Sequence, residues 1–311
     1  MRYAAWALIA LCLANGPALA AKAWMTVQGA HTLVVIDTAS AEIDTTIDLP
    51  AGPVGVAVGA TRVYVTHPES GQLSVIDSQS REVADVWDVG GEPFGVALAQ
   101  KAQRVYVTDW AGDRVDVYDA NNAQSIARIA VGTAPAGIAT TSNGSKVLVA
   151  NRESDSVSVI DTESNTVVSE IAVGTAPFAV LAGPEGRRGF VANVRSDDVS
   201  VIDLNTTETV RVIETGIFPY GLATTDNGDT LLVTEQRHGL LARFDIATGA
   251  RVDAIEIGRQ PDGVAVDRET HRAIVANWFD DTVSIVDLAT GEERAVIEVG
   301  PGPRGFGRFV R

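Results

Sequence analysis

Short stretches in which apolar residues dominate, or alternate with polar ones, recur along the whole chain. Residues 156–160 alternate Ser with Val or Ile, which is typical of a strand with two unlike faces. Residues 137–140 and 146–150 are short apolar stretches joined by a Ser-Asn-Gly turn, in which glycine supplies the positive φ. Residues 166–172 form a further stretch of this kind, and no segment has the period of an amphipathic helix. The pattern predicts four antiparallel strands between residues 137 and 172.

Two residues repeat through the chain at the same intervals, which are 40 residues and then 42 residues five times. One set consists of aspartates: Asp37, Asp77, Asp119, Asp161, Asp203, Asp245 and Asp287. The other set consists of prolines: Pro53, Pro93, Pro135, Pro177, Pro219, Pro261 and Pro303. A period near 42 is typical of the blades of a β-propeller. We therefore predict an all-β fold, a seven-bladed β-propeller of four-stranded antiparallel blades, in which the aspartates cap turns after the third strand.

The first twenty residues have the features of a secretory signal peptide. Arg2 is followed by an apolar run over residues 4–13 and by the small residues of Ala18-Leu19-Ala20. The sequence thus predicts a signal peptide over residues 1–20 and a single propeller over residues 21–311. A periplasmic or secreted protein with no membrane span after cleavage is expected.

The two ends of the propeller segment carry complementary parts of one repeat. Residues 24–26 occupy a second-strand position, whereas residues 305–307 follow a first-strand position. We predict that the C-terminal inner strand joins the N-terminal blade and closes the ring, which leaves no exposed sheet edge there.

The composition excludes several classes of function. Cys12 is the sole cysteine and lies in the signal peptide, so disulfides, cysteine-bound metals, haem attachment and thiol catalysis are not expected. Neither G-x-S-x-G nor H-E-x-x-H occurs, and no catalytic residue is predicted. The net charge of −16 argues against nucleic acid as a partner. The sequence carries no signal for an oligomeric state.

Several segments are similar to one known repeat: residues 63–67 (VYVTH), 105–109 (VYVTD), 131–135 (VGTAP) and 157–162 (VSVIDT). They resemble the YVTN-type β-propeller repeat, which includes YncE-like exported seven-bladed propellers. Related propellers accompany quinone-linked alcohol oxidation or act as metal chaperones, haem d1 domains and lactonases, so the resemblance implies a fold rather than one activity. The last residue of the signature is Asn. It is kept at Asn151, Asn193 and Asn277 and replaced by Val27, His67, Asp109 and Glu235.

Aromatic and arginine side chains gather at one end of the predicted channel, where first strands begin and second strands end. Arginine suits carboxylates and phosphates, and aromatic rings offer flat apolar surface. We predict a non-enzymatic binding protein for a small anionic or aromatic ligand, or for a periplasmic partner protein. Its binding residues would be Trp110, Arg152, Arg195, Tyr220, Arg237 and Trp278. Pairing of these arginines with nearby carboxylates, and packing of the rings between blades, is the structural alternative.

Two other functions stay open. The first is a zinc chaperone that uses His31, His67 and His238, and no cofactor is predicted apart from zinc in this alternative. The second is a propeller enzyme of lactonase or lyase type, in which Glu235 and His67 form an acid–base pair across blades. A link to haem d1 or to a quinone is a further alternative.

Overall fold

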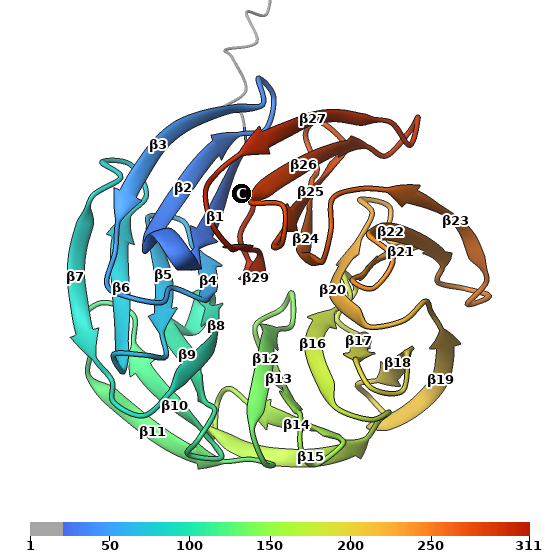
Figure 1. Cartoon of the computed structure of the whole chain (residues 1–311). Coiled ribbons are helices and arrows are strands. Elements are labelled where there is room, and N and C mark those ends of the chain that lie inside the picture. Colours follow the sequence, from blue (N-terminus) through green and yellow to red (C-terminus); the bar gives the residue numbers. More distant parts are fainter. Residues whose placement is uncertain (1–20) are drawn as a thin grey trace, which may run out of the picture.

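The computed structural model describes residues 21–311 as seven β-sheets arranged radially around a central channel (Figure 1). Each sheet has four antiparallel strands, and the second sheet carries an additional strand in parallel at its inner edge. The predicted seven-bladed propeller is confirmed. The predicted signal peptide, residues 1–20, lies outside the described residues.

The blades are numbered here along the chain. From the channel outward, the first blade contains β28 (Pro303–Arg304), β1 (Lys22–Val27), β2 (Thr32–Asp37) and β3 (Glu42–Asp48). In the same order, blade two contains β4 (Gly55–Val58), β5 (Arg62–His67), β6 (Gln72–Asp77) and β7 (Val83–Asp88). Blade three contains β8 (Pro93–Ala99), β9 (Arg104–Asp109), β10 (Arg114–Asp119) and β11 (Ser125–Ala130). Blade four contains β12 (Pro135–Thr140), β13 (Lys146–Asn151), β14 (Ser156–Asp161) and β15 (Thr166–Ala172). Blade five contains β16 (Pro177–Ala182), β17 (Arg188–Asn193), β18 (Asp198–Asp203) and β19 (Glu208–Glu214). Blade six contains β20 (Pro219–Thr224), β21 (Thr230–Glu235), β22 (Leu240–Asp245) and β23 (Arg251–Glu256). Blade seven contains β24 (Pro261–Asp267), β25 (Arg272–Asn277), β26 (Thr282–Asp287) and β27 (Glu293–Glu298). The other elements are β29 (Phe306–Arg308) and the 3₁₀ turns η1 (Gln28–Ala30) and η2 (Gln100–Ala102).

The hydrophobic core lies between the blades. In blade four, β13 is buried at every position after Lys146, because the neighbouring blades cover both of its faces. The outermost strand β15 is mostly exposed, with Ile171 turned inward. Between blades five and six, Phe190, Leu231 and Phe244 belong to one buried cluster. A single blade would expose these apolar faces to water, so the ring stabilises all of its blades together.

Glycine and threonine hold neighbouring inner strands close together. The Thr234 hydroxyl of blade six donates to the Asp262 carbonyl of blade seven at 2.7 Å and accepts from the Gly221 N–H at 2.7 Å. A Cβ added to Gly221 would lie 2.5 Å from that carbonyl oxygen. Thr66 and Thr108 make the equivalent bonds to the Phe94 and Ala136 carbonyls. Glycine is thus required where two inner strands approach backbone to backbone.

The repeat aspartates cap turns, as predicted. Asp77 Oδ1 accepts the N–H groups of Gln79 and Ser80 at 2.9 and 2.8 Å. The same arrangement recurs with both N–H groups at Asp37, Asp203 and Asp287. The aspartates that look most like a ring of ligands are therefore turn residues.

The predicted closure of the ring is confirmed. Strand β28 pairs antiparallel with β1 through Thr26 and Val27, and the blue and red ends of the chain meet there (Figure 1). After Arg304 the backbone leaves β1, and β29 pairs in parallel with β4 of the second blade. Val310 then returns to pair with Ala23. This detour, which the sequence did not predict, places β29 at the centre of the ring (Figure 1).

Candidate functional site

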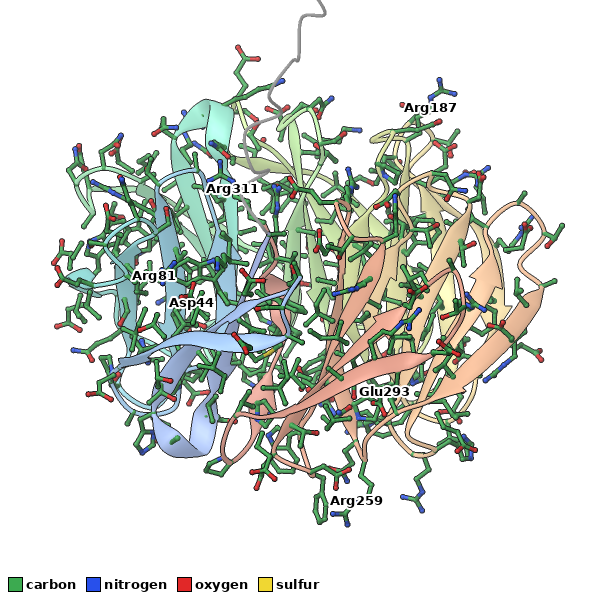
Figure 2. All side chains as sticks on the ribbon, turned by 90° about the horizontal axis from the view of Figure 1, so that it is seen from above. Asp44, Arg81, Arg187, Arg259, Glu293 and Arg311 are labelled. Atoms are coloured by element: carbon green, nitrogen blue, oxygen red, sulfur yellow. The ribbon has the colours of Figure 1, made fainter. Side chains whose placement is uncertain are left out.

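The propeller has two faces, and each face contains one mouth of the channel. The proline mouth is ringed by the seven repeat prolines and the loops between second and third strands. The hairpin mouth is ringed by the turns between first and second strands. Arg259, two residues before Pro261, and Arg187, in the β16–β17 turn, mark the opposite faces in the side view of Figure 2.

Five aromatic rings meet below the proline mouth and form what we term the aromatic plug: Phe94, Trp110, Phe178, Tyr220 and Phe306. The Phe178 and Tyr220 ring centroids are 4.4 Å apart, and Phe306 lies 5.1 Å from Phe178 and 5.2 Å from Phe94. Tilted and edge contacts at such distances are favourable for aromatic rings. The plug therefore fills much of the channel at this end.

A pocket of about 290 Å³ lies beside the plug, and we name it the rim pocket. It is lined by Arg152, Phe178, Val194, Phe218, Tyr220, Gln236, Gln260, Asp262, Trp278 and Arg304. Phe218 and Gln260 have positive φ values of 64° and 47°, in the left-handed region that non-glycine residues rarely occupy. Ala134 and Ala176 have the same conformation before the repeat prolines of blades four and five, so it belongs to the repeat rather than to the pocket.

Three successive blades place a polar side chain at the same position in this pocket. The residue after the repeat proline is Tyr220 in blade six, Asp262 in blade seven and Arg304 in blade one. The other four repeats have Val54, Phe94, Ala136 and Phe178 there. Packing of the ring therefore does not require a polar residue at this position, and its concentration in adjacent blades points to a site.

Asp262 is buried and Arg304 is half-buried beside it, but the two side chains are not hydrogen-bonded to each other. Arg304 Nε donates to Gln28 Oε1 at 3.0 Å, while Arg304 Nη1 lies 3.7 Å from Asp262 Oδ2. The second separation is too long for a hydrogen bond. Within residues 21–311, Arg304 Nη1 and Asp262 Oδ1 are buried and have no hydrogen-bond partner. Such unpaired atoms cost free energy, so the pocket offers both a donor and an acceptor to an incoming group.

Burial also shifts the protonation of this cluster. It raises the pKa of the Asp262 carboxyl, against the lowering effect of the Arg304 charge. Burial, followed by the negative charge of Asp262, raises the pKa of the Tyr220 phenol. Tyr220 is thus a neutral donor at physiological pH. Displaced pKa values of this kind are common among residues that contact ligands.

The structure brings together three of the six predicted binding residues, since Arg152, Tyr220 and Trp278 line the rim pocket. Trp110 belongs to the plug, and the Arg152 guanidinium lies 5.8 Å from its ring centroid. Arg152 also contacts the Glu153 carboxylate. The proline mouth therefore combines an arginine that lines a pocket with the ring packing and carboxylate pairing of the structural alternative.

Arg195 and Arg237 lie outside the rim pocket. Arg195 is 53% exposed and its Nη1 is 3.6 Å from Glu153 Oε2, while Arg237 is exposed. Both stand two residues after the end of a second strand. Arg152 stands one residue after it, as do the pocket residues Gln236 and Trp278. Neighbouring positions in these turns therefore differ in whether they line the pocket.

The predicted histidines do not gather. His31 Nδ1 accepts the Gly52 N–H at 3.1 Å, His67 is fully buried and His238 is exposed. Burial lowers the pKa of His67 to about 4. No group of three or more His, Cys, Asp or Glu side chains suited to a metal occurs in the described part of the chain. Zinc binding stays a prediction, and the described residues contain no such group of ligands to support it.

The asparagine of the repeat is a structural residue, and its replacements are accommodated within their own blades. Asn151 and Asn193 donate to the hydroxyl seven residues later, on Ser158 and Ser200, at 2.8 and 2.9 Å. His67 Nε2 keeps this bond to Ser74 Oγ at 2.8 Å. The acidic replacements are paired with arginine from the third or fourth strand of the same blade: Asp109 with Arg114, and Glu235 with Arg251. The sequence difference at this position therefore reflects packing, and Glu235 and His67 do not line the rim pocket.

Asp262 and Arg304 are the pocket residues that the sequence analysis missed. Each looks ordinary alone, because an exposed charge at a loop needs no explanation. The signal was the run of Tyr, Asp and Arg at one repeat position in three successive blades. Gln236 could have been found in the same way, because it occupies the position of Arg152 and Trp278.

Part of the sequence matches a known family. Residues 136–227 match the family model described as YNCE-like beta-propeller, and they span most of blades four and five and the start of blade six. The seven four-stranded blades extend the same architecture around the ring. The match and the ring of seven blades together support a YncE-like β-propeller. No curated protein matches the chain in sequence.

Several solved structures resemble this propeller in fold. One is Kuenenia stuttgartiensis hydrazine synthase, with a TM-score of 0.75, 17% identity and coverage of 84% of this chain and 91% of that chain. A functionally unknown protein from Desulfotomaculum acetoxidans DSM 771 has a TM-score of 0.78, 17% identity and coverage of 91% and 98%. The dihydro-heme d1 dehydrogenase NirN in complex with DHE has a TM-score of 0.69, 15% identity and coverage of 91% and 74%. Identities this low establish the shared fold alone.

Within residues 21–311, no helix has the length and apolar character that a membrane crossing requires.

Proposed function

We propose that the protein is an exported, non-enzymatic binding protein that holds a small anionic ligand with a flat ring in the rim pocket. The observation that carries this proposal is the buried group of Tyr220, Asp262 and Arg304, whose Oδ1 and Nη1 atoms lack partners among the described residues. Export is proposed from the signal-peptide features of residues 1–20.

Each wall of the pocket has a distinct role in this proposal. Arg152 and Arg304 hold the negative group, because a guanidinium forms paired hydrogen bonds with a carboxylate or phosphate. Trp278 is 36% exposed and offers a flat apolar face at the pocket opening. Asp262 accepts a hydroxyl or amine hydrogen of the ligand. The volume of about 290 Å³ is at the small end of the range for ligand pockets, which limits the ligand to one ring with few substituents.

The test uses benzoate and 4-hydroxybenzoate as probes in isothermal titration calorimetry. Both probes carry the ring and the carboxylate, and the second adds a hydroxyl for Asp262. We expect Arg152→Ala to weaken 4-hydroxybenzoate binding by about tenfold or more, because a hydrogen bond to a charged group contributes roughly 1.5–3 kcal/mol. Asp262→Asn should reduce the preference for 4-hydroxybenzoate over benzoate.

Arg237→Ala is the matched control, because Arg237 lies on the same face but outside the pocket. Its affinity should equal that of the wild type. The proposal fails if neither probe binds, or if Arg152→Ala and Arg237→Ala bind the probes equally well.

A further inference from the structure

The central channel forms a second and larger cavity, which opens at the hairpin mouth and has a volume of about 1010 Å³. Its wall consists mainly of apolar inner-strand residues from successive blades, such as Ala57, Val96, Ile138, Val180, Leu222 and Val264. Tyr220 and Phe306 of the aromatic plug also line it. The cavity, which we name the channel chamber, is therefore an apolar space bounded on one side by the plug.

Three arginines also line the channel chamber: Arg268 in the β24–β25 turn, Arg308 at the end of β29 and Arg311. Arg308 is there because the C-terminal segment leaves β1 and pairs with β4, where Arg308 is opposite Ala57. Figure 2 shows Arg311 on the side of the disc that carries Arg187, the hairpin face. Positive charge thus converges on an apolar chamber in a chain with a net charge of −16.

Arg308 lacks a compensating carboxylate. No ion pair within 4.0 Å joins its guanidinium to any acidic group of residues 21–311. Desolvation, followed by the like charges of Arg268 and Arg311, lowers the pKa of Arg308.

The neighbouring acidic groups are engaged elsewhere or paired weakly. Asp267 Oδ2 accepts the hydroxyls of Thr38 and Thr270 at 2.7 and 2.5 Å. Arg268 Nε lies 3.8 Å from Asp226 Oδ1, and Arg311 Nη1 donates to the Gly59 carbonyl at 2.7 Å. Glu269 and Lys101 line the chamber as an acid and a base whose charges cancel.

Arg268, Arg308 and Arg311 are exposed at the hairpin mouth, where their like charges repel one another. Guanidinium groups also bind carboxylates with paired hydrogen bonds. An occupant that suits this chamber therefore has a negative group at the arginines and an apolar body against the wall. Aqueous phosphate would satisfy the charge but leave the apolar wall uncovered, and a neutral hydrocarbon would do the reverse.

We propose that the hairpin mouth is a second binding site, which takes an amphipathic carboxylate with its carboxylate on Arg308 and its apolar body in the channel chamber. Arg268 and Arg311 flank the carboxylate. The site shares only the Tyr220 ring with the rim pocket, and it does not depend on the function proposed for that pocket.

The probe is 11-(dansylamino)undecanoic acid, whose fluorescence increases when it leaves water. Dodecanoate, dodecan-1-ol and acetate serve as competitors, since they supply both parts of the ligand, the apolar part alone and the carboxylate alone. We expect dodecanoate to displace the probe at a concentration about tenfold lower than dodecan-1-ol, or lower still. Acetate should not displace the probe.

Three variants in the chamber and two controls outside it locate the site. Arg308→Gln and Arg268→Gln should each weaken probe binding by about tenfold or more, and Ala139→Phe should block it by filling the chamber. Arg187→Gln, on the same face but outside the chamber, and Arg152→Ala, in the rim pocket, should bind like the wild type. Arg308→Gln should leave the melting temperature of the free protein unchanged or raise it, because it removes like-charge repulsion.

The proposal is wrong if the probe does not bind, if dodecan-1-ol competes as well as dodecanoate, or if both Arg308→Gln and Arg268→Gln bind like the wild type. It is also wrong if Arg152→Ala abolishes binding and Ala139→Phe does not, since the probe would then occupy the rim pocket. If the melting temperature of Arg308→Gln is lower than that of the wild type, Arg308 has a packing role, and weaker binding by this variant does not support the site. In that case Arg268→Gln decides, and unchanged probe binding by Arg268→Gln would overturn the proposal.

Discussion

The pair formed by Glu235 and Arg251 tests whether replacements of the repeat asparagine are structural. Glu235 is the last residue of β21 and has no solvent exposure. Its carboxylate accepts a hydrogen bond from each of the two terminal guanidinium nitrogens of Arg251, both at 2.9 Å. It also accepts the Gly216 N–H at 2.7 Å. The perturbation is Arg251→Ala, which leaves a buried carboxylate with the Gly216 N–H as its remaining partner among these bonds.

The structure sets the expected magnitude. Removing one partner of a buried pair costs about 3–5 kcal/mol, whereas an exposed pair contributes less than about 1 kcal/mol. The Arg251 side chain is 38% exposed but Glu235 is not exposed at all, and the buried partner is the one that loses its counter-charge. Because water reaches the guanidinium, we expect the lower end, about 3 kcal/mol, or a fall of about 6 °C in melting temperature.

The assay is thermal unfolding followed by circular dichroism. A second background, Glu235→Asn with Ala242→Ser, rebuilds the asparagine–serine bond found in blades four, five and seven. In that background Arg251→Ala should cost less than about 1 kcal/mol, as should Arg294→Ala at an exposed pair in the wild type. An equal cost of Arg251→Ala in the two backgrounds would refute the structural interpretation of Glu235.

Three further predictions concern the scaffold. Burial lowers the pKa of His67 to about 4, so stability should fall as the pH drops from 6.5 toward 4, and the melting temperature of His67→Asn should depend less on pH across that range. The Ser40 N–H and the Lys22 ammonium hold the pKa of Asp37 at about 2, so the stability that Asp37 contributes above pH 4 is lost as the pH falls to 2. The melting temperature of Asp37→Asn should therefore fall less than that of the wild type between pH 4 and pH 2. Gly263→Ala would place a Cβ 1.6 Å from the Gly305 carbonyl oxygen and should cost at least about 3 kcal/mol of unfolding free energy, measured with urea. Ala179 occupies the same repeat position in blade five, where the inner strand already accommodates a methyl group, so Ala179→Gly should cost less.

The fold could be predicted from the sequence because its signals are local and repeated. An aspartate that caps its own turn leaves the same trace in every blade. The closure of the ring was also predictable, since its two half-repeats can be counted. The detour of β29 was not, because Gly307 adopts its φ of +110° only in contact with a second blade.

The candidate site could be predicted only in part, because its residues come from repeats that are far apart in sequence. The direction of the strands places Arg152 and Trp278 at the same end of the channel, and both residues line the rim pocket. The direction of each side chain did not follow, so Arg195 was grouped with Arg152 although one position separates their places in the repeat. The unpaired atoms of Asp262 and Arg304 depend on distances between side chains, which no sequence pattern contains.

The two kinds of residue after the repeat proline divide the proline mouth into unequal halves. A ring of identical blades would present seven equivalent wedges, and a small ligand without such symmetry would have no preferred place among them. Here Phe94 and Phe178, from blades three and five, place apolar rings in the plug. Asp262 and Arg304, from blades seven and one, keep their polar groups beside it. Because Gly221, Thr234 and their counterparts already hold the blades together, this position can differ from blade to blade without opening the ring. Under the proposed function, that difference confines the ligand to one side of the mouth.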